Sequence, residues 1–240
     1  MSLLELEYVS KRYGRGSHEQ DALHDVSLEL DTGELVAIWG RRRSGRSTLL
    51  RVAAGVETPD VGIVRFEGHD LSNRGAEWHR GGIRHCRKAF RPAQGEFVLD
   101  QLMIGQLTRG ISPAQARSFA RDALERVGVG QSAGLRPSDL DSTEIALVAI
   151  ARALVHQPKL LLIDEPTLGV DLTSRDQILL LLRSLADEGI AVLMSTGETA
   201  CLSGADRALS LSKGELHGKL TVPELAPVVS LRATGLSASA

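Results

Sequence analysis

Residues 39–50, with the sequence WGRRRSGRSTLL, have the glycine spacing of a phosphate-binding loop. Gly40 and Gly45 are followed by Ser47, and in such a loop backbone N–H groups and the next helix N-terminus surround phosphate groups. Arg46 replaces the usual lysine after the second glycine, so the charge is kept on a larger, planar group. An ordinary basic turn before a helix is the alternative interpretation of this stretch.

A second stretch, LLLIDEPT at residues 160–167, places Asp164 and Glu165 directly after an apolar run. Such a run is typical of a buried parallel strand, and open α/β sheets bind ligands at the carboxyl ends of their strands. An aspartate there can hold Mg²⁺, and a following glutamate can orient or deprotonate an attacking water. A solvated turn is the alternative, and the phosphate-loop spacing in the same chain disfavours it.

The sequence around both stretches predicts strands that alternate with helices, which indicates a parallel sheet. The first 70 residues are β-rich, and the apolar strand ELVAIWG leads directly into the glycine loop. Helical periodicity predominates from about 74 to 156, before the strand that ends at Asp164. Further expected elements are helices at 47–55, 112–129, 142–157 and 174–189, a strand at 190–198 and a hairpin at 207–220.

Composition indicates a soluble intracellular protein. The chain has 240 residues, a formal net charge of -2 and a pI of about 6.4, so no basic excess indicates nucleic acid as a partner. Two cysteines, Cys86 and Cys201, form no disulfide framework and fit a reducing compartment. The longest apolar runs are far shorter than the roughly 20 residues that span a bilayer. The N-terminus has no signal-peptide pattern, and any role at a membrane therefore requires a partner.

Over roughly residues 3–220 the chain resembles the nucleotide-binding subunits of ATP-binding cassette (ABC) transporters. The stretches that carry this resemblance are GELVAIWGRRRSGRSTLLRVAAGVETPDVGIVRFEG, PSDLDSTEIALVAIARALVHQPKLLLIDEPTLGVD and VLMSTGETA. It implies an α/β fold, the P-loop NTPase of the ABC type, with a mostly parallel sheet core, an antiparallel β edge and a helical subdomain. The sequence of these stretches is most similar to those of cassettes of the lipoprotein-release, macrolide-export and cell-division types.

The resemblance implies ATP and Mg²⁺ as cofactors and assigns a role to each matching residue. Tyr13 matches the aromatic residue that stacks on adenine, although an isolated surface tyrosine is the alternative. Glu165 matches the catalytic glutamate, and Asp171 matches an aspartate at the dimer interface. Ser47 and Asp164 match the Mg²⁺ ligands. The residues implied to surround the phosphates are Gly40, Arg43, Ser44, Gly45, Arg46, Ser47 and Thr48.

Several positions depart from the family pattern, and all of them concern the γ-phosphate or its Mg²⁺. Arg43 and Arg46 replace a glycine and the lysine of the phosphate loop. The family signature LSGGE becomes LDSTE at 140–144, which places an aspartate where a serine faces the γ-phosphate. Gly197 occupies the position of the switch histidine. The glutamine of the Q-loop aligns near Lys88, and Gln94 would replace it only after a six-residue slip.

The resemblance also implies how the chain is organised and with what it assembles. Residues 1–220 are expected to form a single ABC nucleotide-binding domain, with the helical subdomain at about 84–156 and a loosely ordered tail at 221–240. The implied partners are transmembrane permease subunits, whose coupling helix would meet residues 88–106, and a second ABC cassette in a homodimer or heterodimer. The expected location is the cytoplasmic face of the cell membrane, peripheral through the permease.

Two functional hypotheses follow. In the first, the chain is an ATP-binding subunit that couples nucleotide binding, and weak or partner-dependent hydrolysis, to membrane subunits for export or release. In the second, it is a catalytically inactive pseudo-ATPase that acts as a docking or gating scaffold in such an assembly. A soluble cassette of the DNA-repair or translation type fits less well, because those proteins carry two cassettes or long insertions. The transported substrate stays open.

Overall fold

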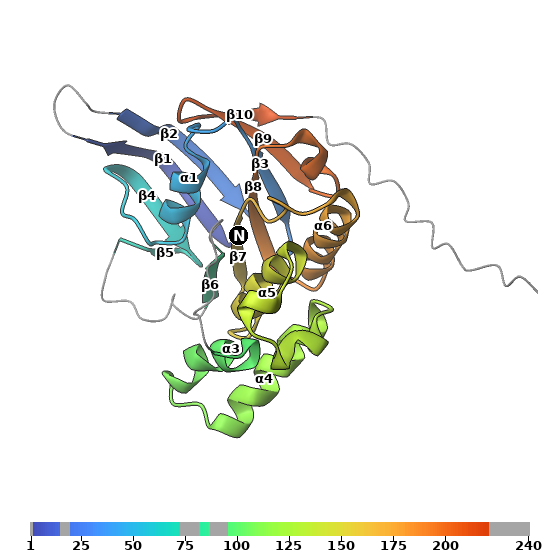
Figure 1. The fold of residues 1–240 in the computed structure, drawn as a ribbon. Helices are drawn as coiled ribbons and strands as arrows, with labels where there is room; N and C mark the ends of the chain where they lie inside the picture. The colour runs from blue at the N-terminus through green and yellow to red at the C-terminus, as the bar shows by residue number, and fades with distance from the viewer. Residues whose placement is uncertain (1, 15–19, 73–81, 87–95, 221–240) are drawn as a thin grey trace, which may run out of the picture.

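The computed structural model describes residues 2–14, 20–72, 82–86 and 96–220 (Figure 1). The expected tail at 221–240 and both Q-loop candidates, Lys88 and Gln94, lie outside these residues. The elements are β1 (Leu4–Tyr13), β2 (Gln20–Leu30), β3 (Leu35–Trp39), α1 (Arg46–Ala53), β4 (Val61–Phe66), β5 (His69–Asp70), β6 (Ile83–Cys86), α3 (Val98–Leu107), α4 (Pro113–Arg126), α5 (Ser142–Leu154), β7 (Leu160–Asp164), α6 (Leu172–Asp187), β8 (Ala191–Thr196), β9 (Arg207–Ser212) and β10 (Glu215–Lys219).

The central sheet has six strands in the order β10-β9-β3-β8-β7-β6. All neighbours are parallel except β10, which returns antiparallel to β9 through the predicted hairpin. Because side chains alternate across a strand, Leu161 and Ile163 of β7 belong to one hydrophobic core and Leu160 and Leu162 to the other. The sheet is therefore buried on both faces, as its continuous apolar strands predict.

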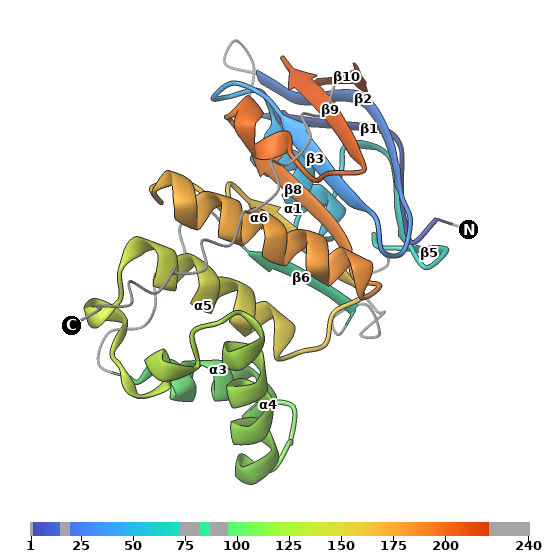
Figure 2. The same ribbon diagram turned by 90° about the vertical axis from the view of Figure 1, so that its right-hand side faces the viewer.

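A second, antiparallel sheet lies against one side of this core. Its strands follow the order β2-β1-β4-β5, and its inner side chains share a hydrophobic cluster with α1 and the central sheet. Figure 2 shows α1 on this side and α6 with α5 on the opposite side of the central strands. The predicted α/β fold, a mostly parallel core sheet with an antiparallel edge, is confirmed.

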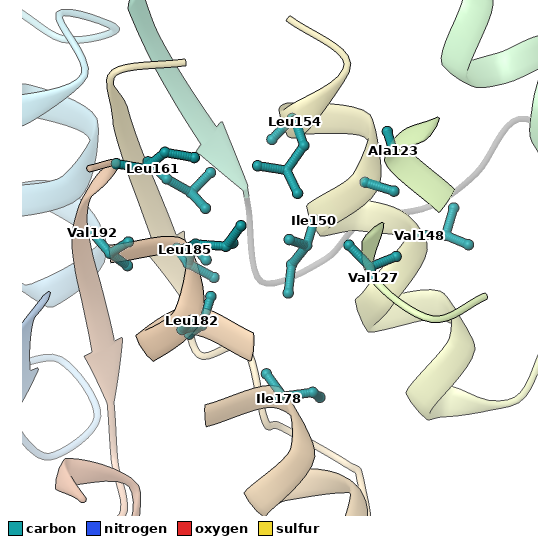
Figure 3. Close-up of a cluster of buried hydrophobic side chains, with 14 of the residues drawn as sticks. Ala123, Val127, Val148, Ile150, Leu154, Leu161, Ile178, Leu182, Leu185 and Val192 are labelled. Atoms are coloured by element: carbon teal, nitrogen blue, oxygen red, sulfur yellow. The ribbon is translucent and has the colours of Figure 1, made fainter. Parts of the chain in front are cut away.

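Helices α3, α4 and α5 extend away from the β6 edge of the sheet (Figures 1 and 2). Figure 3 shows part of the junction with the core: Val127, the C-cap residue of α4, Ile150 of α5 and Leu182 of α6 belong to one buried cluster. These side chains are all less than 7% exposed. One continuous cluster thus holds the start of α5 in a defined place relative to the strand ends.

One element within the stretch that was expected to be helical is a strand. Residues Ile83–Cys86 form β6, which pairs in parallel with β7. Four residues are too few to show a strand period in the sequence, and backbone pairing to the edge of β7 decides their conformation. Among the described residues, no helix is long and apolar enough to cross a membrane.

Candidate functional site

The glycine loop joins β3 to α1 at the carboxyl end of the central sheet. Gly45 is the N-cap of α1 with φ 107°, and it provides no side chain to cap the helix. A Cβ atom on Gly45 would lie 2.1 Å from the carbonyl oxygen of Ala22, so only glycine fits there. The first turn of α1 therefore presents backbone N–H groups that no side chain of the N-cap residue satisfies, which is the arrangement that binds anions.

Of two other loop residues, one has a strained backbone and one has a buried hydroxyl without a hydrogen-bond partner. Arg43 has φ 64°, in the left-handed region that glycine favours, which explains physically why a glycine was expected at this position. Ser44 is 6% exposed, and within the described residues its Oγ has no hydrogen-bond partner. Arg43 and Gly45 therefore both have a left-handed backbone, although the side chain at Arg43 differs from the family pattern.

Replacing Arg43 with glycine is expected to raise the free energy of unfolding by about 0.5 kcal/mol. The left-handed conformation costs a non-glycine residue about 1–2 kcal/mol, and glycine removes this strain. Glycine also loses more conformational entropy on folding, which offsets about 0.5–1 kcal/mol of the gain. Urea denaturation of Arg43→Gly measures the difference. Gly68, which also has positive φ and open space around it, provides the reverse control, because Gly68→Ala should lower stability. A less stable Arg43→Gly protein would contradict the assignment of strain to this residue.

Ser47 and Asp164, the two predicted Mg²⁺ ligands, are brought together across the sheet. Ser47 Oγ donates a hydrogen bond to Asp164 Oδ2 at 2.7 Å. Asp164 ends β7, is 8% exposed, and accepts a second hydrogen bond from Ser195 Oγ on the neighbouring strand β8. Both residues offer oxygen atoms, the ligands that Mg²⁺ prefers.

Arg46 and Glu165 form a buried ion pair beside this couple. Arg46 Nη2 lies 2.7 Å from Glu165 Oε1, and the two side chains are only 7% and 12% exposed. In the described part of the chain Arg46 Nη1 has no hydrogen-bond partner. A Cβ atom on Gly197 would lie 3.6 Å from Arg46 Nη2, so the guanidinium occupies the space above this glycine. Sequence reasoning placed Arg46 on phosphate and did not foresee that it reaches the implied catalytic glutamate.

Tyr13 is not an isolated surface residue, because it is tied to α1. Arg51 Nη2 donates to Tyr13 Oη at 3.0 Å and to Thr48 Oγ1 at 3.1 Å. Tyr13 Oη donates in turn to Glu57, which also accepts from Arg51 Nε at 2.7 Å. Burial by itself lowers the pKa of Arg51, but the hydrogen bonds to Tyr13 and Glu57 more than offset this and raise it. Arg51 and Glu57 were missed because no motif marks them.

A pocket of about 570 Å³ opens beside the loop. Arg46, Glu165 and Gly197 line it together with Arg41 and Arg42. Those two arginines are exposed, and they form no ion pair with any described residue. Tyr13 does not line this pocket, and its connection to the implied phosphate residues runs through Arg51, which bonds to both Tyr13 and Thr48.

The altered signature begins α5 with a capping box. Asp141 Oδ1 accepts a hydrogen bond from the Glu144 backbone at 2.8 Å, and Glu144 Oε2 accepts one from the Asp141 backbone at 3.1 Å. The LDSTE sequence is thus a local helix start. Its carboxylates accept hydrogen bonds from backbone N–H groups at the start of α5 and neutralise the positive end of the helix dipole. In the family pattern, by contrast, glycines at these positions leave the helix N-terminus open to phosphate.

Removing this cap is expected to cost about 1 kcal/mol of stability, since that is the usual contribution of an N-cap aspartate. Asp141→Ala should show this loss in thermal unfolding, whereas Asp141→Asn should not, because asparagine caps a helix equally well. Equal loss in both variants would show that the charge of Asp141, and not its cap, stabilises the start of α5.

Asp171, implied to lie at a dimer interface, caps α6 in the same manner. Its Oδ1 accepts hydrogen bonds from the backbones of Thr173 and Ser174 at 2.9 and 3.1 Å, and its Oδ2 accepts one from Ser174 Oγ at 2.6 Å. The bonds from Ser174 lower the pKa of this exposed carboxyl. Asp171 therefore fixes the turn between Glu165 and α6.

Comparisons with known proteins agree with this fold. The sequence profile of the ABC transporter family matches residues 23–168. The lipoprotein-releasing system ATP-binding protein LolD of Gluconobacter oxydans (strain 621H) is 36% identical over 221 residues, covering 90% of this chain and 95% of that protein. The chain therefore belongs to the ABC transporter family as an ATP-binding cassette, and the resemblance read from the sequence is confirmed.

Solved structures show the same fold. A dimer of the ATP-binding cassette MJ0796 in a post-hydrolysis state, bound to ADP and Pi, superposes with a TM-score of 0.83 at 25% identity, over 92% of this chain and 100% of the other. The cassette cbiO1 of Clostridium perfringens, part of the transporter complex cbiONQ, gives a TM-score of 0.78 at 25% identity, over 90% and 86% of the two chains. These structures support the ABC cassette fold assigned above.

Proposed function

We propose that this chain is the ATP-binding subunit of an ABC transporter that works in export or release, and that it binds nucleotide but hydrolyses it weakly or only with a partner. One observation supports this proposal most directly. The phosphate loop leaves the N-terminus of α1 without a side-chain cap, and its cation, Arg46, is bonded to Glu165. The loop backbone favours binding, and the ion pair opposes turnover.

Nucleotide binding is supported by the backbone of the loop. Phosphate loops hold their ligand mainly through N–H groups and a helix N-terminus, and Gly45 leaves both open. Arg46, Ser47 and Thr48 begin the helix, and Gly40 and Ser44 shape the turn before it. In this proposal Tyr13 stacks on the adenine, held in place by its hydrogen bonds to Arg51 and Glu57.

Mg²⁺ fits the pair formed by Ser47 and Asp164. Magnesium in phosphoryl-transfer sites uses one or two protein oxygens and takes its remaining ligands from phosphates and water. In agreement with this, the described residues contain no group of three or more His, Cys, Asp or Glu that could hold a metal ion alone. Bound there, the ion would neutralise charge on the phosphates. Ser47 and Asp164 are already positioned for it by the hydrogen bond between them and by Ser195.

Weak hydrolysis is supported by three features. Glu165 must release its bond to Arg46 before that oxygen can accept a proton from water. Gly197 provides no imidazole at the pocket wall. Asp141 would place a carboxylate near the γ-phosphate of a nucleotide bound by a second cassette, which is repulsive. The first feature concerns the attacking water, the other two concern the reacting phosphate, and none of them concerns the loop backbone.

Permease subunits and a second cassette are the proposed partners, with the chain peripheral at the cytoplasmic face of the membrane. In the paired state the loop of one cassette would face the α5 start of the other. The direction, export or release, is supported by the LolD relative, which is named as part of a lipoprotein-releasing system. The dimeric MJ0796 structure supports pairing.

Calorimetric titration of the purified chain with Mg-ATP is the test of this proposal. We expect binding that Arg46→Ala weakens and that Arg46→Lys retains, because lysine supplies the same charge. Melting curves of both variants at the assay temperature separate loss of binding from loss of folding. No heat of binding at millimolar ATP with the folded, unchanged chain would refute nucleotide binding by the chain on its own.

The second candidate function, a pseudo-ATPase scaffold, is favoured by the carboxylate cap on α5. A turnover assay in reconstituted membranes with the permease separates the two functions. Phosphate release that depends on Glu165, and is lost in Glu165→Gln, supports the first. Nucleotide-dependent assembly without phosphate release supports the second.

A further inference from the structure

The loop that follows α1 is hydrogen-bonded to the end of β1. The carboxylate of Asp60 accepts hydrogen bonds from the Arg12 backbone N–H at 2.7 Å and from Lys11 Nζ at 2.9 Å. Lys11 Nζ also donates to the Thr58 carbonyl oxygen at 2.9 Å. The backbone N–H of Asp60 donates to the Ser10 carbonyl oxygen at 2.9 Å. These contacts fix the end of β1 against this loop.

The side chain of Tyr13, the last residue of β1, is held by the same part of the chain. Tyr13 Oη donates to the carboxylate of Glu57 and accepts from Arg51 Nη2 at 3.0 Å. Arg51 Nε donates to Glu57 at 2.7 Å, so the three side chains form a closed set of hydrogen bonds. Lys11 Nζ lies 6.0 Å from the centroid of the Tyr13 ring. The hydroxyl of Tyr13 is therefore fixed, while the residue remains 38% exposed and keeps surface for a ligand.

A ring that is already held binds a stacked partner more tightly than a ring that rotates freely. Ordering a side chain at the moment of binding costs free energy, and a side chain that was ordered during folding has already lost that freedom. For one side chain this difference corresponds to roughly two- to ten-fold in affinity. The contacts of Tyr13 therefore bear directly on how tightly a base stacks on its ring.

We propose that Arg51, Glu57 and Lys11 are positioning residues for the base of the bound nucleotide, and that they act by fixing the ring of Tyr13. The inference rests on the proposed function, in which Tyr13 stacks on the adenine. None of the three residues lines the pocket beside the glycine loop. Arg51 also bonds to Thr48 Oγ1 at 3.1 Å, whereas among the described residues Glu57 and Lys11 form no hydrogen bond with an implied phosphate residue. Their effect should therefore appear in the affinity for the base and not in the affinity for the phosphates.

Two ligands with the same phosphate chain separate these affinities. Mg-ATP carries the base, whereas magnesium tripolyphosphate, a chain of three phosphates, carries none. Calorimetric titration of the unchanged chain with each ligand gives two dissociation constants. The ratio of the tripolyphosphate value to the ATP value measures what the nucleoside contributes to binding. Tyr13→Ala should lower this ratio by about ten-fold, which is within the range for the loss of one stacked base.

Variants of the positioning residues should lower the same ratio. Glu57→Ala and Lys11→Ala should each lower it by about two- to ten-fold and leave the tripolyphosphate dissociation constant within about two-fold of the original value. Arg51→Met should lower the ratio as well, and Tyr13→Phe, which keeps the ring and removes only the hydroxyl, should match it. Melting curves establish which variants are folded at the assay temperature. If a larger change does not fold, Tyr13→Phe still tests the inference.

Arg65 provides the matched control for Arg51. Its side chain is 31% exposed, against 30% for Arg51, and it forms an ion pair with Glu7 in the same antiparallel sheet as Tyr13. Arg65→Met should leave the ratio unchanged. A double variant tests whether Arg51 acts through the ring. Tyr13→Ala/Arg51→Met should have the ratio of Tyr13→Ala alone, because no ring is left to position.

The outcomes separate this inference from the proposed function. An unchanged chain that binds ATP, with a ratio that stays the same in Arg51→Met and Glu57→Ala, overturns the inference and leaves nucleotide binding intact. A lower ratio in Tyr13→Ala/Arg51→Met than in Tyr13→Ala also overturns it, as does a ratio of one or less in the unchanged chain. An unchanged chain that binds neither ligand refutes nucleotide binding and this inference together.

Discussion

Gly45→Ala is expected to lower the free energy of unfolding by about 4 kcal/mol, the sum of forced overpacking and an unfavourable left-handed backbone. The new Cβ would lie 2.1 Å from the carbonyl oxygen of Ala22, which belongs to strand β2 and cannot move without disturbing the antiparallel sheet. Chemical denaturation followed by circular dichroism measures the loss. Nucleotide binding should be lost with it, because the loop must shift to accept the methyl group.

Gly197→Ala, at the wall of the pocket beside the loop, is the control. Its Cβ would meet nothing closer than Arg46 Nη2 at 3.6 Å, an ordinary van der Waals distance. The change should therefore alter stability by less than about 1 kcal/mol. Similar losses at the two glycines would show that the close approach of Gly45 to Ala22 does not constrain the loop.

Breaking the buried ion pair is the second large effect. Arg46→Met is expected to cost about 3 kcal/mol, because it leaves the Glu165 carboxylate buried without its cation. Replacing both residues, as in Arg46→Met/Glu165→Leu, should recover most of this loss, since an apolar pair of similar volume leaves no uncompensated charge. Urea denaturation of the four proteins in a double-mutant cycle should give a coupling energy above about 1 kcal/mol.

The exposed pair of Arg126 and Glu188 provides the control for this cycle. Both side chains are more than a third exposed, at 35% and 49%. Arg126→Met should therefore cost less than about 1 kcal/mol, because water screens the interaction. Additive losses for Arg46 and Glu165 would contradict the view that they stabilise the fold as a unit.

The ion pair also connects stability to the proposed function. In the proposed function the guanidinium of Arg46, which is bonded to Glu165, also contacts the phosphates, so nucleotide binding and the ion pair would compete for it. Variants that release Glu165 from Arg46 should have a lower free energy of unfolding and a changed affinity for ATP. Measuring both properties on the same variants shows whether Arg46 exchanges its partner when ATP binds.

The sequence by itself determined the features that depend on residues close together in the chain. The spacing of Gly40, Gly45 and Ser47 located the loop, and its strand-to-helix context followed from the apolar run before it. The apolar run before Asp164 predicted the buried strand β7, and the antiparallel edge and the hairpin were also predicted. These features could be predicted because turn chemistry and hydrophobic periodicity act over a few residues.

Only the tertiary structure decided what the functional side chains touch. Arg46 and Glu165 are 119 residues apart, and their contact depends on how β3 and β7 are placed in one sheet. The short strand β6 takes its conformation from pairing with β7, and the close approach of Gly45 to Ala22 depends on where β2 packs. No local pattern encodes such contacts, because strand order and register are set by the burial of the whole core. The sequence therefore identified the family and indicated a candidate site, and the fold determined that Arg46 is paired with the implied catalytic acid, Glu165.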